Sequence, residues 1–238
     1  FGFDAAVADT MNRVRRLPLI GGKNAYTTGI LRALVTARRN RCDIYADGEK
    51  LTGKTEEVIN RKGIARTFQN IRLFSNMSVI RNVMVGLANR PEYRCNPFTS
   101  MLRLPGHFKT EVEMREKAKE ILRIFGLEEE RNNLSCNLPY GKQRKLEIAR
   151  ALATDPKLLL LDEPAAGMNP NETADLMNIV RFIRDNYDMT ILLIEHDMKF
   201  VSGLCDEITV LNFGTELASG ETKTVLSDPE VIKAYIGG

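Results

Sequence analysis

Two short apolar runs that each end in polar residues constrain the fold of this chain more than any other feature. Residues 158–161 are four leucines followed by Asp162 and Glu163, and the largely apolar run 190–194 precedes an acidic residue and His196. Runs that are apolar on both faces are typical of strands buried in a parallel sheet. Because open α/β sheets bind ligands at the carboxyl ends of their strands, we expect these polar side chains to lie at a functional edge.

The segments around these runs have helical spacing. Residues 170–187 carry apolar side chains on one helical face, which predicts the crossover helix that two parallel strands require. A second helix is predicted to begin at the capping box of Thr110 and Glu113 and to end at Gly126. We expect this helix to be the start of a helical lobe. Before it, residues 90–108 contain three prolines, which indicates an irregular insertion.

Composition disfavours several classes of protein. The apolar runs are far shorter than the roughly 20 residues of a membrane-spanning helix, and a net charge of +3 with scattered basic residues does not favour a nucleic-acid partner. The four cysteines lie far apart without a Cys-x-x-Cys pair, which argues against a zinc site or a disulfide framework and favours a reducing cytosol. The sequence opens at Phe1 without a signal peptide, so we expect no secretory leader and a start inside a longer natural protein.

A glycine-led helix start is the second chemical feature of the sequence. Residues 138–150 run from Leu-Pro-Tyr-Gly into a strongly helical segment, and the backbone N–H groups at such a start can bind phosphate. Asp162, at the end of a buried strand, is suited to hold magnesium, and Glu163 beside it can polarise an attacking water. A strand that ends in a solvated acidic turn is the alternative for this pair taken alone.

Together these two segments resemble the signature and Walker B motifs of ABC ATPases, in the variant carried by branched-chain amino acid importers. Further segments are similar to the family in order and spacing: residues 65–74 to the Q-loop, 165–170 to the D-loop, 194–198 to the switch-histidine segment and 228–237 to the C-terminal ending. The resemblance covers the chain almost continuously from about residue 43 to the C-terminus.

The resemblance implies a role for each matching residue. Glu163, Gln69 and His196 would be catalytic, with the imidazole of His196 contacting the γ-phosphate. Asp162, Gln69 and Thr27 would hold Mg²⁺. The signature residues that would bind ATP are Tyr140, Gly141, Lys142 and Gln143. A surface-loop position for Gln69 and a strand-capping position for His196 are the alternatives when either residue is taken alone.

The phosphate loop departs from the family pattern. A P-loop needs Gly-x-x-x-x-Gly-Lys-[Ser/Thr], whose glycines let the backbone curl around the phosphates and whose lysine neutralises them. The candidate residues here are Gly21, Gly22, Lys23, Asn24, Ala25, Tyr26, Thr27 and Thr28. Alignment on the threonines puts Tyr26 at the lysine position and Ala25 at the glycine position, with Lys23 three positions early. Phe1 resembles the family's adenine-stacking aromatic residue, and Phe3 is the alternative.

We therefore predict one ABC ATPase domain over residues 1–238. Its α/β, P-loop NTPase-like core with a mainly parallel sheet would take in residues 1–69 and 156–238, and a helical lobe would span residues 70–155. The resemblance implies an ATP-binding and ATP-hydrolysing subunit that powers an importer for branched-chain or related amino acids, with ATP and Mg²⁺ as cofactors. The altered P-loop leaves a weakly nucleotide-binding, non-catalytic ABC subunit as the alternative.

The same resemblance implies partners and a location. A second ABC ATPase subunit, identical or related, would sandwich two ATP molecules with this one, and integral-membrane permease subunits would complete the transporter. The chain would lie in the cytoplasm, peripheral on the inner face of the cell membrane. A soluble ABC ATPase acting on DNA or ribosomes ranks last, because the long coiled-coil or tandem-domain insertions usual in that class are absent from this sequence.

Overall fold

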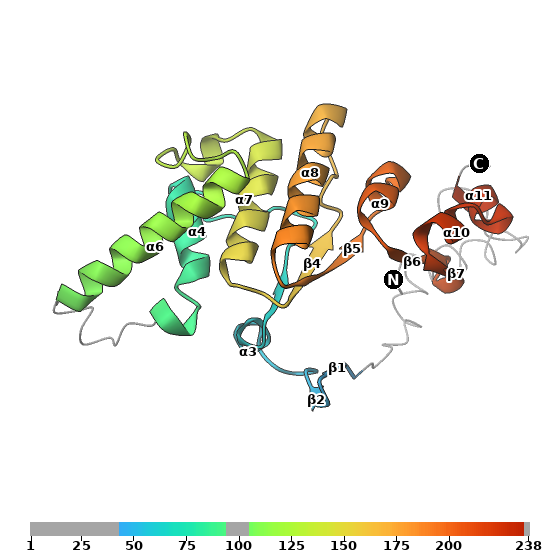
Figure 1. Cartoon of the computed structure of the whole chain (residues 1–238), viewed down its shortest axis with the longest axis horizontal. Helices are drawn as coiled ribbons and strands as arrows, with labels where there is room; N and C mark the ends of the chain where they lie inside the picture. The colour runs from blue at the N-terminus through green and yellow to red at the C-terminus, as the bar shows by residue number, and fades with distance from the viewer. Residues whose placement is uncertain (1–42, 94–104, 236–238) are drawn as a thin grey trace, which may run out of the picture. The chain divides into compact units, whose positions relative to one another are not determined.

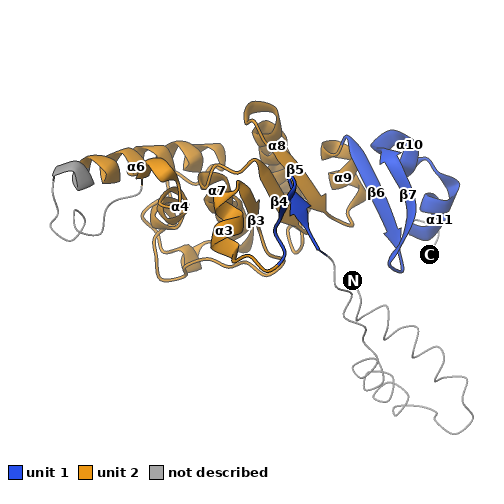
Figure 2. Ribbon diagram, turned by 90° about the horizontal axis from the view of Figure 1, so that it is seen from below, with its two compact units in different colours: residues 1–52, 206–238 blue, residues 53–205 orange. Residues whose placement is uncertain are grey.

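The computed structural model describes residues 43–93 and 105–235 (Figure 1). They fall into two compact units, a larger one over residues 53–205 and a smaller one that contains residues 43–52 and 206–235 (Figure 2). The predicted phosphate-loop residues and Phe1 lie outside the described residues. The predicted division into core and helical lobe stays a prediction.

The larger unit is built around three parallel strands. β3 (Ile64–Arg66), β4 (Leu158–Asp162) and β5 (Thr190–Ile194) pair in the order β3-β4-β5. The leucines of β4 alternate between fully buried and half-buried positions, so the strand packs on both faces of the sheet. The parallel sheet predicted from the two apolar runs is confirmed. Because the strands are parallel, their carboxyl ends share one edge.

α8 (Pro170–Asn186) is the crossover between β4 and β5. A capping box starts it: the side chain of Asn169 accepts the N–H of Glu172, and the carboxylate of Glu172 accepts the N–H of Asn169. Its buried face is the one predicted from helical spacing, formed by Leu176, Ile179, Val180 and Ile183. The crossover-helix prediction is therefore confirmed, with an end one residue earlier than expected.

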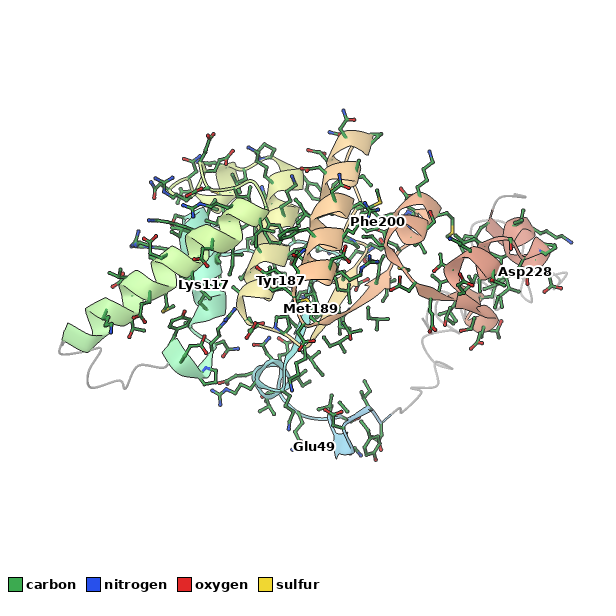
Figure 3. The ribbon with its side chains drawn as sticks, in the orientation of Figure 1. Glu49, Lys117, Tyr187, Met189, Phe200 and Asp228 are labelled. Carbon is green, nitrogen blue, oxygen red and sulfur yellow. The ribbon has the colours of Figure 1, made fainter. Side chains whose placement is uncertain are left out.

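α9 (Met198–Leu204) follows β5 and packs against α8. Asp197 caps its N-terminus, because one side-chain oxygen accepts two backbone N–H groups of the first turn. At the other end, Arg181 of α8 donates to a carbonyl of the last turn of α9 at 2.8 Å. Phe200, labelled in Figure 3, is almost fully buried in the core of the unit.

Three helices complete the core of the larger unit: α4 (Val79–Leu87), α6 (Pro105–Ile124) and α7 (Tyr140–Ala153) pack against one another. Three short elements belong to the same unit: α3 (Glu56–Arg61) precedes β3, η1 (Pro91–Tyr93) follows α4, and η2 (Ser135–Asn137) precedes α7. The buried side chains of α4, α6 and α7 form one continuous apolar cluster with those of the strands and α8. None of the helices in the described residues combines the length and the hydropathy that a bilayer span requires.

The start of α6 differs from the prediction. The helix begins at Pro105, and the expected capping box of Thr110 and Glu113 lies inside it. Proline suits the first turn of a helix because the N–H groups of that turn have no intrahelical acceptor. The end agrees with the prediction: Gly126 has φ +64°, and the next N–H donates to the carbonyl of Leu122 at 2.9 Å.

The smaller unit contains two antiparallel hairpins. β1 (Tyr45–Ala46) pairs with β2 (Glu49–Lys50), and β6 (Glu207–Asn212) pairs with β7 (Thr215–Glu221). Each two-residue turn has positive φ at both positions and glycine at the second, as hairpin turns of this length require. α10 (Thr222–Leu226) and α11 (Pro229–Tyr235) pack on the second hairpin through a small core of Val210, Val225 and Val231.

Candidate nucleotide site

The carboxyl edge of the sheet gathers the predicted site residues that follow the strands. β4 ends in Asp162, and Glu163 follows it in the turn. Gln69 lies three residues after β3, and His196 lies two residues after β5. The expectation that strand ends would bring these polar side chains to one edge is met.

Glu163 and Gln69 contact each other directly. The Nε2 of Gln69 donates a hydrogen bond to the Oε2 of Glu163 at 3.0 Å. The backbone of Glu163 has φ +44°, a left-handed conformation that costs a residue with a side chain about 1 to 2 kcal/mol. Its N–H donates to the carbonyl of Ile194 at 2.9 Å, which ties the turn to the end of β5. A strained turn thus presents the Glu163 carboxylate to the Q-loop.

Asp162 forms an ion pair at the same edge. The guanidinium of Arg66, the last residue of β3, donates to the Oδ2 of Asp162 at 2.8 Å. The Arg66 side chain is 55% exposed, whereas that of Asp162 is 21% exposed. The Oδ1 of Asp162 makes no hydrogen bond within residues 43–93 and 105–235. One carboxylate oxygen is therefore paired and the other is open to a ligand.

The oxygen atoms at this edge fit magnesium. Gln69 donates through its nitrogen, so its Oε1 is left to act as a ligand beside the Oδ1 of Asp162. The described residues hold no cluster of three or more histidine, cysteine or acidic side chains that could enclose a metal by themselves. Mg²⁺ is usually held by one or two side-chain oxygens together with phosphate oxygens and waters, so a sparse oxygen set is what it requires.

His196 and its neighbour Glu195 have opposite environments. The imidazole of His196 is 71% exposed, whereas the side chain of Glu195 is 1% exposed. One oxygen of Glu195 accepts the N–H of Ala165 at 3.0 Å. The other accepts the N–H groups of His196 at 3.0 Å and of Asp197 at 3.4 Å. The exposed imidazole is thus carried by a turn whose backbone is bound to a buried carboxylate.

The signature residues lie at the start of α7. A Cβ added at Gly141 would approach the Oε1 of Glu172, in the first turn of α8, to 2.7 Å, so a larger residue here requires the Glu172 carboxylate to move. The ring of Tyr140 packs beside Gly167 in the turn between β4 and α8. No side chain caps the N-terminus of α7, which follows Pro139. The first N–H groups of this helix therefore receive no acceptor from the side chain of the N-cap residue.

Two of the predicted ATP-binding residues have partners within the chain. Lys142 pairs with Glu130 and lowers the pKa of that carboxyl group through its hydrogen bond. Gln143 donates from Nε2 to the carbonyl of Leu138 at 2.8 Å. The structure brings neither residue to the Asp162–Glu163 end of the sheet. Both instead stabilise the segment that leads into α7.

Sequence reasoning missed a buried ion pair on α7. Arg144 is fully buried and donates to the carbonyls of Phe68 and Gln69, each at 2.7 Å. Glu147 accepts from Arg144 at 3.0 Å and from the N–H of Arg72 at 3.0 Å. The pair therefore binds the backbone on both sides of the Gln69 loop. Opposite charges at i and i+3 on the apolar side of a predicted helix were the available signal, because buried charges require partners.

The loop beyond Gln69 is held by a buried amide. Asn82 of α4 accepts the N–H of Phe74 and donates to the carbonyls of Phe74, Met77 and Ser78. Phe74 and Met77 nevertheless expose 45% and 38% of their surface. The guanidinium of Arg150 lies over the Phe74 ring, 5.4 Å from its centroid, and burial lowers the pKa of this arginine. The loop thus presents apolar side chains on a rigid base.

A parallel sheet with acidic residues at or directly after the ends of β4 and β5, joined to a helix with a glycine-containing N-terminus, is an arrangement typical of nucleotide-binding enzymes of the α/β class. The family model for ABC transporters matches residues 7–166. The chain belongs to the ABC transporter family. The resemblance to ABC ATPases and the fold class predicted from the sequence are confirmed.

Known proteins with the same features support this assignment. The chain is 43% identical to the high-affinity branched-chain amino acid transport ATP-binding protein LivG of Escherichia coli K12, over 79% of this chain and 73% of the relative. It is also 43% identical to BraF of Pseudomonas aeruginosa, which has the same description, over 82% and 75%. An ATP-binding cassette of an ABC transporter in its ADP conformation superposes with a TM-score of 0.65 at 32% identity, covering 84% of this chain and 78% of that one.

Membership of this family makes the chain a nucleotide-binding ATPase that is coupled to transport. The prediction of an ATP-hydrolysing subunit is therefore confirmed, and the non-catalytic alternative is not favoured. The roles assigned to individual residues, Glu163, Gln69, His196 and Asp162 among them, stay predictions that the geometry allows.

Proposed function

We propose that this chain hydrolyses magnesium-ATP to power the import of branched-chain amino acids. The solute is proposed because relatives 43% identical to this chain carry the description branched-chain amino acid transport. The observation that carries the catalytic assignment is the 3.0 Å hydrogen bond between Gln69 and Glu163 at the carboxyl edge of the sheet. This contact supports Glu163 as the base, because it links the carboxylate to the Gln69 loop while the Glu163 N–H holds the turn to the end of β5.

The side chains at this edge divide the work of hydrolysis. Asp162 and the Oε1 of Gln69 would hold Mg²⁺, which when bound neutralises charge on the phosphate oxygens. Glu163 orients a water and accepts its proton, while the hydrogen bond from Gln69 keeps the carboxylate aimed. The exposed imidazole of His196 is free to meet the γ-phosphate. Because Arg66 already binds one oxygen of Asp162, the negative charge of this edge is partly balanced before nucleotide arrives.

The proposed function includes a second ATPase subunit. The N-cap residue of α7 makes no side-chain cap hydrogen bond, and the first turn carries no acidic residue. These features suit a phosphate bound on a facing subunit, because helix N-termini attract anions. Tyr140 is 45% exposed beside Gly167, so the same end of α7 offers an aromatic contact surface. Two copies, or this chain and a related one, would then complete each other's sites.

The proposed contact with the permease lies on residues 69–84 together with the insertion at residues 90–108. Phe74 and Met77 expose apolar surface there, and their loop continues directly from Gln69. Apolar side chains displayed on a rigid loop are suited to receive a helix of a partner. This contact would hold the chain peripherally on the cytoplasmic face of the membrane, and it would connect the permease to the loop that carries Gln69.

The experiment that tests the proposed function replaces Glu163→Gln. The variant keeps the size of the side chain and removes the base, so we expect ATP hydrolysis to fall by about 10² to 10⁴-fold while nucleotide binding is retained. Turnover, calorimetric ATP affinity and ATP-dependent dimerisation are measured with the membrane partner present. Glu216→Gln, an exposed carboxylate of β7 in the smaller unit, is the matched control and should behave as the parent. Equal turnover in Glu163→Gln and the parent would exclude Glu163 as the base.

A further inference from the structure

Glu195 is a buried carboxylate that binds two turns at once. Its two oxygens face different segments: one accepts the N–H of Ala165 in the turn after β4, and the other accepts the N–H groups of His196 and Asp197 in the turn after β5. All three donors are backbone groups within 3.4 Å. A single side chain therefore bridges the exits of two neighbouring strands.

This bridge holds a charge where no cation balances it. Within the described part of the chain, neither lysine nor arginine pairs with Glu195, and the only basic group nearby is the imidazole of His196, whose Nδ1 lies 3.9 Å from Oε2. A carboxylate with a 1% exposed side chain persists only where hydrogen bonds replace its water. Its role is therefore tied to the N–H groups that it collects.

Those N–H groups belong to the turns that carry the proposed catalytic residues. Ala165 follows Glu163 by two positions, and His196 is the next residue after Glu195. A second link, from the Glu163 N–H to the carbonyl of Ile194 at 2.9 Å, joins the same two turns. The strained backbone of Glu163, with φ +44°, thus lies between two cross-links to the end of β5.

We infer that Glu195 is a positioning residue that keeps Glu163 and His196 in one rigid frame. It acts through the backbone N–H groups that its two oxygens accept, and the inference rests on the roles proposed for Glu163 and His196. Without the bridge the two turns stay joined only by the hydrogen bond from the Glu163 N–H to the carbonyl of Ile194, so the carboxylate base and the imidazole are no longer held in one geometry toward the γ-phosphate. Misplacement of such groups by about 1 Å is enough to slow an enzyme by about 10²-fold.

The chemistry of the bridge gives an isosteric test. Glutamine has one acceptor oxygen and one donor nitrogen. In Glu195→Gln the oxygen can therefore accept the N–H of one turn, whereas the NH₂ group faces the N–H of the other turn and cannot accept it. Asp197→Asn is the matched control, two residues away. The Oδ1 of Asp197 accepts the N–H groups of Lys199 and Phe200, and asparagine keeps that acceptor and caps helices as well as aspartate. Both changes remove one negative charge from the same turn.

The full-length chain with each substitution is compared with the parent. For Glu195→Gln we expect kcat to fall at least about tenfold with little change in KM. We also expect faster hydrogen exchange at the amides of Ala165 and His196, with exchange in α7 unchanged. Asp197→Asn should match the parent in all three measurements. Hydrogen exchange is read without nucleotide, so it reports on the bridge whatever the rate of hydrolysis.

Two results would overturn the inference. One is parent-like kcat and parent-like exchange in Glu195→Gln, which would mean that the bridge is dispensable. The other is a uniform rise of exchange over the whole larger unit, which would show a structural role alone. Glu163→Gln, measured in parallel, distinguishes failure of the proposed function from failure of this inference. If Glu163→Gln turns over normally, the proposed base is wrong. If Glu163→Gln loses turnover while Glu195→Gln turns over normally, only the positioning role of Glu195 is wrong.

Discussion

The Gln69 loop and the turns after β4 and β5 meet at one sheet edge but are held in different ways. The Gln69 loop is bound from outside the sheet, by Arg144 and Glu147 of α7. The two turns are bound to each other, through the Glu195 carboxylate and a backbone hydrogen bond. The loop will therefore follow movements of α7, whereas Glu163 and His196 will move together with the strands.

The largest expected effect on stability comes from removing the buried ion pair of α7 that holds the Gln69 loop. Arg144→Ala leaves the Glu147 carboxylate buried without its cation, so we expect the free energy of unfolding to fall by about 3 to 5 kcal/mol. Chemical denaturation measures this loss. The double substitution Arg144→Met with Glu147→Leu removes both charges and should recover most of the stability, because well-packed apolar residues can replace a buried ion pair.

The double variant also separates stability from coupling. It lacks the hydrogen bonds to the carbonyls of Phe68 and Gln69, so amide exchange in residues 68–72 should stay fast and turnover should stay low although the fold is intact. Exchange at Ala165 and His196 should be unchanged, because their bridge does not involve α7. Parent-like turnover in the double variant would show that the Gln69 loop does not depend on α7.

A smaller effect on stability is expected where the start of α7 contacts the first turn of α8. Gly141→Ala pushes a methyl group against the carboxylate of Glu172 and weakens the cap of α8, but alanine is also the better helix former, so we expect a net cost of at most about 1 kcal/mol. Gly126→Ala is the matched control: it forces alanine into φ +64° at a similar cost of about 1 kcal/mol, with no atom within 4 Å of the new Cβ.

The two glycine variants should differ in assembly and not in stability. Sedimentation with ATP, in a background that also carries Glu163→Gln, measures dimer formation. We expect Gly141→Ala to weaken the dimer, because its methyl group lies at the helix start proposed to face the partner's nucleotide. Dimerisation that falls equally in Gly141→Ala and Gly126→Ala would contradict that proposal and point to stability alone.

The smallest effect is expected at the ion pair between Arg66 and Asp162. Arg66→Ala removes an exposed cation from the edge, and exposed pairs contribute about 1 kcal/mol or less to stability. Denaturation at low and high salt measures the contribution, which screening should reduce. Lys50→Ala, which removes a similarly short exposed pair with Asp43 in the smaller unit, is the comparison. A loss of more than about 2 kcal/mol in the free energy of unfolding would mean that the pair of Arg66 and Asp162 is a structural link between the end of β3 and the turn after β4.

The elements with a local signal could be predicted from the sequence. The leucine run of β4 and the spacing of α8 depend on neighbouring residues, and both appear where they were expected. The start of α6 was missed because the capping-box pattern at Thr110 also fits a helix interior, while Pro105 marks the actual first turn. The hairpins of the smaller unit were not predicted, although the Asp47-Gly48 dipeptide is a turn signal.

The site was only partly predictable for a physical reason. Glu163, Gln69 and His196 could be proposed because strand ends and motif order place them together. The spacing of Arg144 and Glu147 could have indicated an ion pair, but the loop that Arg144 binds and the turns that Glu195 binds could not be predicted, because those partners are backbone carbonyls and N–H groups, which carry no sequence signature. A buried charge that binds backbone is visible only once the fold has set which loop it faces.

The amide of Asn82 has a consequence for any partner that meets the loop at Phe74. Its hydrogen bonds to Phe74, Met77 and Ser78 order these residues when the chain folds. Ordering a flexible segment at the moment of association lowers affinity, whereas a surface already ordered incurs that entropy loss in advance. A cytoplasmic helix of the proposed permease partner would therefore bind a surface that is already ordered. Its dissociation rate would then depend on the contacts formed and not on the refolding of a loop.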